Sequence, residues 1–183
     1  MKLIHCADIH LDAPMDSSLP AEKADVRRGE ILETFLALIN HARQTNVRVV
    51  MVAGDLLDSV RVSATTQDVV YEAMKNASDV DFLLVPGNHD AVSTALLGHH
   101  LSHNVKIFGP QWETVQYGGI TISSRTLPQI SNVDQGQYDL CQGLQLDENL
   151  TNIVMLHGQL GATSGPYAIG AAQLRGRGID YLA

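Results

Sequence analysis

Two kinds of apolar pattern alternate along the first hundred residues. Short runs of aliphatic and β-branched residues cover 2–6, 47–53 and 82–85, and each predicts a buried strand. Between these runs, apolar residues recur at helical spacing over 21–45 and 64–76, with polar residues on the opposite side. Strands that alternate with helices in this way predict β-α-β units and therefore a parallel sheet.

The pattern changes after about residue 105. Short strands with tight connections suggest a second, meander-like sheet packed on the first; they cover 105–108, 112–115 and 119–123. Residues 129–148 are polar and predict a loop or a short helix. Further elements are predicted as helices at 93–101 and 171–175 and as strands at 152–156 and 179–183.

Potential metal ligands follow four of the predicted buried strands. They are Asp8 and His10, then Asp55, then Asn88 with His89 and Asp90, and finally His157. In an open α/β sheet, ligands bind beyond the carboxyl ends of the strands, where residues distant in sequence converge. Any one of these motifs alone could be an ordinary turn or a structural histidine. The four together favour a metal centre.

The residue types indicate different roles at this centre. Side-chain direction alternates along a strand, so Asp8 and His10 lie on the same side and can bind one ion together. The two carboxylate oxygens of Asp55 can each reach a separate ion, which makes Asp55 the best candidate for a bridge. Asp58 is better explained as a supporting residue or a helix start than as a ligand. His157 projects from the sheet edge into the same space.

The Asn-His-Asp motif is the most specific of the four. Asn88 can ligate a metal through its amide oxygen, which leaves His89 free to act on the substrate as an acid or by stabilising negative charge. Asp90 can orient His89 or brace the turn. Oxygen and imidazole ligands without thiolates suit Mn, Fe or Zn. Two such ions about 3.5–4 Å apart promote displacement at phosphorus, so the predicted chemistry is phosphoester hydrolysis.

Composition limits the class of protein. A chain of 183 residues with 45% hydrophobic and 17% charged residues predicts one globular domain, residues 1–183. Two cysteines are too few for a disulfide framework, which favours a cytoplasmic location. The net charge of -8 argues against a free-standing binder of the nucleic-acid backbone.

The order of the motifs resembles that of the calcineurin-like metallophosphoesterases. The matching segments are Asp8-x-His10, Gly54-Asp55-Leu56-Leu57-Asp58, Gly87-Asn88-His89-Asp90 and His157-Gly158. Residues 4–12 and 104–109 resemble the SbcD-type DNA repair exonucleases within that family. The resemblance implies a two-sheet αββα sandwich, DNA as substrate, an SbcC-like ATPase as partner, and manganese as the usual metal.

The resemblance also assigns roles to the individual residues. By that resemblance, Asp8 and His10 hold the first ion, Asp55 bridges, and Asn88 and His157 hold the second, while His89 faces the scissile phosphate. The family continues into a Gly-His-x-His motif that this chain lacks, which predicts a domain incomplete at its C-terminal end and a weak or inactive fragment. Exposed sheet edges in such a fragment predict self-association as a homo-oligomer.

Two alternatives remain open on the sequence. A phosphatase or a small-nucleotide phosphodiesterase would need the same metal ligands, because these motifs do not select the substrate. A non-catalytic module could keep the fold for partner binding alone.

Overall fold

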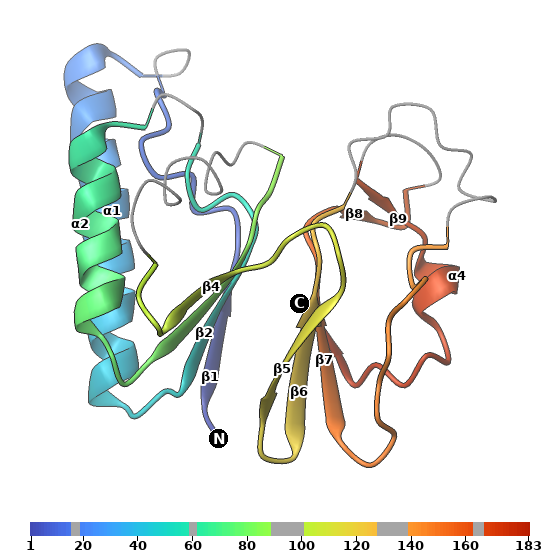
Figure 1. The fold of residues 1–183 in the computed structure, drawn as a ribbon. Coiled ribbons are helices and arrows are strands. Elements are labelled where there is room, and N and C mark those ends of the chain that lie inside the picture. The colour runs from blue at the N-terminus through green and yellow to red at the C-terminus, as the bar shows by residue number, and fades with distance from the viewer. Residues whose placement is uncertain (16–18, 59–61, 89–100, 128–138, 163–166) are drawn as a thin grey trace. The chain divides into compact units, whose positions relative to one another are not determined.

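The computed structural model describes residues 1–15, 19–58, 62–88, 101–127, 139–162 and 167–183. These residues form two compact units, Met1–Ile107 and Phe108–Ala183. A four-stranded sheet lies in each unit (Figure 1).

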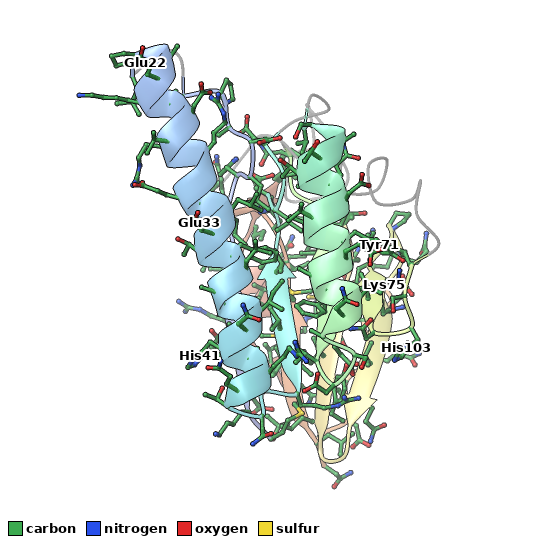
Figure 2. All side chains as sticks on the ribbon, turned by 90° about the vertical axis from the view of Figure 1, so that its left-hand side faces the viewer. Glu22, Glu33, His41, Tyr71, Lys75 and His103 are labelled. Carbon is green, nitrogen blue, oxygen red and sulfur yellow. The ribbon has the colours of Figure 1, made fainter. Side chains whose placement is uncertain are left out.

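The sheet of the first unit is wholly parallel. Its strands lie side by side in chain order: β1 (Leu3–Cys6), β2 (Val49–Ala53), β3 (Asp81–Val85) and β4 (Val105–Ile107). Crossovers between parallel strands are right-handed, so a sequential strand order puts the connecting helices on one face. Helices α1 (Ala21–Gln44) and α2 (Ala64–Asn76) accordingly lie side by side over the same face (Figures 1 and 2).

The helical periodicity predicted from the sequence matches the packing of these helices. Phe35 of α1 and Met74 of α2 are buried in one core with Val50 and Phe82 of the sheet. Figure 2 shows polar side chains such as Glu33 along the outer side of α1. Every residue of β2 is buried, as expected for a central strand of a parallel sheet.

Asn104 anchors the C-terminal end of α2 to the sheet. Its side chain is buried, and Nδ2 donates to the carbonyl oxygens of Met74 (2.9 Å), Ala77 (3.0 Å) and Val80 (3.0 Å). The backbone carbonyl of Asn104 accepts a hydrogen bond of 2.7 Å from the backbone N–H of Phe82. The chain is therefore fixed beside β3 immediately before β4 begins.

This anchoring explains why one prediction is wrong. The strand expected at 105–108 as part of the second sheet is β4, which pairs in parallel with β3 of the first sheet. The pattern of a short apolar strand does not reveal its neighbour, which here is decided by the distant contacts of Asn104. The helix expected at 93–101 lies, apart from its last residue, outside the described residues.

The sheet of the second unit mixes both strand directions. Strands β5 (Glu113–Tyr117) and β6 (Ile120–Ser124) form an antiparallel hairpin, and the order across the sheet is β10-β7-β6-β5. Strands β7 (Thr151–Met155) and β10 (Tyr181–Leu182) run parallel to β6 and correspond to the strands predicted at 152–156 and 179–183. The connection before β7 is long enough for a parallel crossover.

Small elements complete the second unit. The paired strands β8 (Gln159–Leu160) and β9 (Ala168–Ile169) were not predicted, because two residues carry no periodic pattern. Helix α4 (Ala171–Leu174) matches the predicted short helix. Gln173 of this helix accepts a hydrogen bond of 3.3 Å from the backbone N–H of Leu140, and Leu140 is buried in one core with Val154 and Leu156.

The predicted mixed α/β class is confirmed. The parallel sheet of the first unit carries two helices on one face, and the sheet of the second unit combines an antiparallel hairpin with parallel strands. Among the residues that the structure describes, no helix is long and apolar enough to cross a membrane.

We expect Asn104→Ala to lower the free energy of unfolding by about 1–3 kcal/mol, because buried carbonyl groups would lose their donor. Urea unfolding measures this change. Asn149→Ala is the matched control, since the exposed Asn149 side chain bonds only to the neighbouring Asp147 within the described residues. Equal decreases in the free energy of unfolding of the two variants would contradict the anchoring role of Asn104.

Candidate metal centre

The loops that follow β1 and β2 run side by side in the first unit. The backbone N–H of Asp8 donates to the carbonyl of Gly54 (3.1 Å), and that of His10 donates to the carbonyl of Asp55 (2.9 Å). A further bond of 3.0 Å joins Leu11 to Leu56. Parallel pairing thus continues past the strand ends and places three predicted metal ligands next to one another.

The backbone is strained at these ligands. Asp8, His10 and Asp55 have φ values of 54°, 50° and 49°, which lie in the left-handed region that non-glycine residues rarely adopt. Each such residue costs about 1–3 kcal/mol and persists only where its surroundings determine it. The paired loops supply these surroundings, and the strain is concentrated where the sequence predicted the metal centre.

The side chains of the paired loops converge. Asp55 is buried with 3% of its surface exposed, and one of its oxygens lies within 4.8 Å of a carboxylate oxygen of Asp8. The distance from Asp55 Oδ2 to His10 Nε2 is 3.7 Å. Oxygen and nitrogen ligands of one ion each lie about 2.0–2.2 Å from it, so separations of this size suit a shared cation.

Asp58 supports His10. Its Oδ1 lies 2.9 Å from His10 Nδ1, on the side of the imidazole opposite to Asp55. When Nδ1 carries the proton and donates it to Asp58, the lone pair of Nε2 is available to a metal; this carboxylate–histidine arrangement is typical of metal sites. Of the two roles considered for Asp58, support of a ligand fits, because Ser63 caps the following helix.

Gly87 presses against Asp55 at the end of β3. A Cβ atom at this position would lie 2.1 Å from Asp55 Oδ1 and 2.6 Å from Asp55 N. Gly87 is not in the left-handed region, so the glycine is needed for this close approach and not for its backbone freedom. The exposed Asn88 follows directly. Sequence reasoning missed this contact; a glycine beside a predicted ligand was the available signal.

His157 lies in the second unit, immediately after β7. Its ring packs edge-on against that of Tyr167, with 6.4 Å between ring centroids and an interplanar angle of 73°. Gly158 follows in a tight contact, since a Cβ there would lie 2.3 Å from the carbonyl oxygen of Tyr167. Strands β8 and β9 therefore constrain the chain beside His157. Its role as a ligand stays a prediction, as do the roles of His89 and Asp90, which lie outside the described residues.

The two thiols play no part in this cluster. Burial raises the pKa of Cys6 to about 11, and burial also raises the pKa of Cys141. Their sulfur atoms donate weak hydrogen bonds of 3.5 Å to the carbonyls of Met51 and Gln173, respectively. Both thiols are protonated near neutral pH, so the candidate ligands are carboxylate, imidazole and amide groups.

These ligands at the carboxyl edge of a parallel sheet define a candidate divalent-metal centre in an α/β protein. The model of the calcineurin-like phosphoesterase family matches residues 1–182. The chain therefore belongs to the calcineurin-like phosphoesterases. This membership places it among the metal-dependent hydrolases of phosphoesters, which use divalent ions.

Two individual proteins are similar to parts of the chain. The DNA double-strand break repair protein Mre11 of Methanopyrus kandleri is 27% identical over 92 residues, which are 49% of this chain and 19% of that protein. The matched segment is thus a small part of this relative. A solved structure of a protein of unknown function from Aquifex aeolicus aligns with a TM-score of 0.41 and 14% identity, over 86% of this chain and 77% of its own.

We expect Asp58→Asn to weaken Mn²⁺ binding about 10–100-fold, because the amide holds the imidazole of His10 less firmly in the tautomer that a metal needs. Isothermal titration calorimetry on the metal-free chain measures this affinity. Asp25→Asn, an identical change at an exposed position of α1, is the control and should bind as the unmodified chain does. An unchanged affinity in Asp58→Asn would show that His10 needs no such support.

Gly87→Ala should reduce Mn²⁺ affinity at least about tenfold, since the added methyl group would displace the carboxylate of Asp55. The control is Gly29→Ala, where a Cβ meets nothing within 4 Å and where alanine favours the helix. Calorimetry gives the affinity, and circular dichroism shows whether each variant is folded. A folded Gly87→Ala variant with unchanged affinity would contradict the proposed contact.

Proposed function

We propose that this chain is part of a two-metal phosphodiesterase that acts on DNA, of the SbcD type. The observation that carries the proposal is the position of His10 between Asp55 and Asp58 in a chain of the calcineurin-like phosphoesterase family. The similarity to an Mre11 protein supports DNA as the substrate class. We also propose a cytoplasmic location and an SbcC-like ATPase as partner.

The described residues fit a divalent ion. Asp8 and His10 would hold the first ion, Asp55 would contact both, and Asn88 with His157 would hold the second. When bound, two such ions supply an activated water and stabilise the attacking and leaving oxygens. Manganese is the proposed metal, with Fe or Zn as alternatives for the same mixed donors.

The chain's own residues have separate tasks in this proposal. Asp58 accepts a hydrogen bond from Nδ1–H of His10 and so fixes which nitrogen faces the metal. His89 would approach the scissile phosphate and either donate a proton to the leaving oxygen or stabilise developing negative charge. Asp90 would orient His89.

A phosphatase or small-nucleotide phosphodiesterase is the second candidate. The net charge of -8 favours it, because proteins that bind a long phosphate backbone usually carry clustered positive charge. The metal ligands themselves would be the same for either substrate.

Turnover by the protein in its full natural length distinguishes these functions. With Mn²⁺, we expect hydrolysis of duplex DNA and of an aryl phosphodiester, and little hydrolysis of the corresponding monoester. Asp55→Asn should lower turnover about 100-fold or more through loss of metal binding, whereas the exposed Asp25→Asn should leave it unchanged.

Preference for the monoester, or for a small phosphodiester with DNA left intact, would support the second candidate instead. Negligible Mn²⁺ binding that Asp55→Ala does not change would point to a non-catalytic module.

A further inference from the structure

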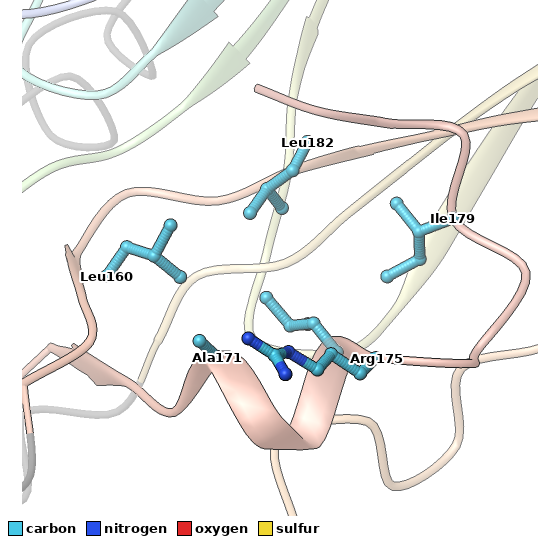
Figure 3. A pocket seen from close by; sticks show the side chains of 6 residues that line it. Leu160, Ala171, Arg175, Ile179 and Leu182 are labelled. Atoms are coloured by element: carbon cyan, nitrogen blue, oxygen red, sulfur yellow. The ribbon is translucent and has the colours of Figure 1, made fainter.

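A small pocket opens in the second unit, and His157 is not among the residues that line it. Its volume is about 230 Å³, and its walls come from β8, α4, β10 and the segment before β10 (Figure 3). The lining residues are Leu160, Ala171, Leu174, Arg175, Ile179 and Leu182. All but one of these are apolar.

The apolar walls are incompletely covered by the chain itself. Leu160 is 60% exposed, which is unusual for a leucine that borders a core. Leu174, Ile179 and Leu182 pack with one side on the buried core of the unit and remain partly accessible on the pocket side. A ligand with an apolar group would remove this surface from water.

Arg175 is the charged group of the pocket, and Figure 3 shows its guanidinium extending toward Ala171. Within the described part of the chain it makes no hydrogen bond or ion pair. The neighbouring Arg177 differs, because it is held by Asp139 at 3.6 Å and by the carbonyl of Gln173 at 3.2 Å.

The acid next to the pocket is Asp180, between the lining residues Ile179 and Leu182. It accepts a hydrogen bond of 2.7 Å from the backbone N–H of Asn152, and within the described residues it forms no ion pair with Arg175. A guanidinium presents a planar fork of donors that matches a carboxylate bidentately. Charge complementarity therefore favours an anionic group at the rim, beside the apolar walls.

The volume of the pocket indicates the size of the apolar group that it can hold. Sites for drug-sized molecules occupy about 300–1,000 Å³, whereas an apolar cavity of about 150 Å³ accepts benzene. A pocket of about 230 Å³ suits one ring or one branched alkyl group.

We propose that this pocket binds a small carboxylate that carries a single ring or a branched alkyl chain. The carboxylate pairs with Arg175, and the apolar group lies among Leu160, Ile179 and Leu182. The proposal is independent of metal binding and of phosphoester hydrolysis.

Titration of the isotope-labelled chain with 3-phenylpropionate, followed by NMR, tests the proposal. We expect saturable shifts at Leu160, Ala171 and Ile179 with a dissociation constant of about 1 mM, the affinity expected for a ligand of this size. The uncharged 3-phenylpropionamide should bind about tenfold more weakly, because it cannot form the ion pair.

Three variants distinguish the contribution of the Arg175 charge to binding from that of the apolar pocket. Arg175→Gln should bind the acid and the amide equally, and the retained amide binding shows that the pocket is still folded. Ala171→Leu should fill the pocket and abolish binding of both. Lys23→Gln removes a positive charge at an exposed position of α1 and should keep the preference for the acid.

Equal affinity for the acid and the amide in the unmodified chain would overturn the proposal, as would shifts that do not saturate. Shifts of the same resonances with protein concentration, in the absence of ligand, would show that a second copy of the chain occupies the pocket, and this result would also overturn it.

Discussion

The hydrogen bonds between the loops after β1 and β2 are the constraint on which the candidate metal centre depends. They hold Asp8, His10 and Asp55 in left-handed conformations that these residues would otherwise leave. In these conformations the side chains of the two loops point toward one another and not along the alternating directions of a strand. The same bonds therefore explain both the strain and the convergence of ligands.

The packing around Asp55 then determines what these converging side chains can bind. Asp55 is buried, and a buried carboxylate is unfavourable unless a cation or hydrogen-bond donors compensate it. The nearby carboxylate of Asp8 adds repulsion, while Gly87 leaves no room for Asp55 to turn away toward β3. His10 is held on its far side by Asp58. A divalent cation among these groups would relieve the repulsion between the carboxylates of Asp8 and Asp55. Both carboxylates and the imidazole of His10 could then serve as its ligands.

The sequence predicted local elements well and long-range partners less well. Helix α2 was predicted with its observed limits because its apolar residues recur at helical spacing. The sequence predicted that Asp8, His10 and Asp55 lie together because the carboxyl ends of parallel strands meet at one edge of the sheet. By contrast, the sheet that β4 joins depends on Asn104, and the need for Gly87 depends on Asp55. Such contacts connect segments that are distant in the sequence, and the hydrophobic pattern of one segment does not predict its contact with the other.

The charge distribution bears on what reaches the metal centre. Among the described arginines of the first unit, Arg43 and Arg48 pair with Asp79 and Asp81, whereas Arg27 and Arg28 pair with Glu30 and Asp25 one turn away in α1. These ion pairs compensate the charge of the four arginines. Two bound divalent ions would offset half of the formal charge of -8, and would do so where a phosphate group reacts. At physiological salt, exposed acids farther than about 8 Å are largely screened. The charge distribution of the first unit therefore suits a single phosphodiester group better than a long phosphate backbone.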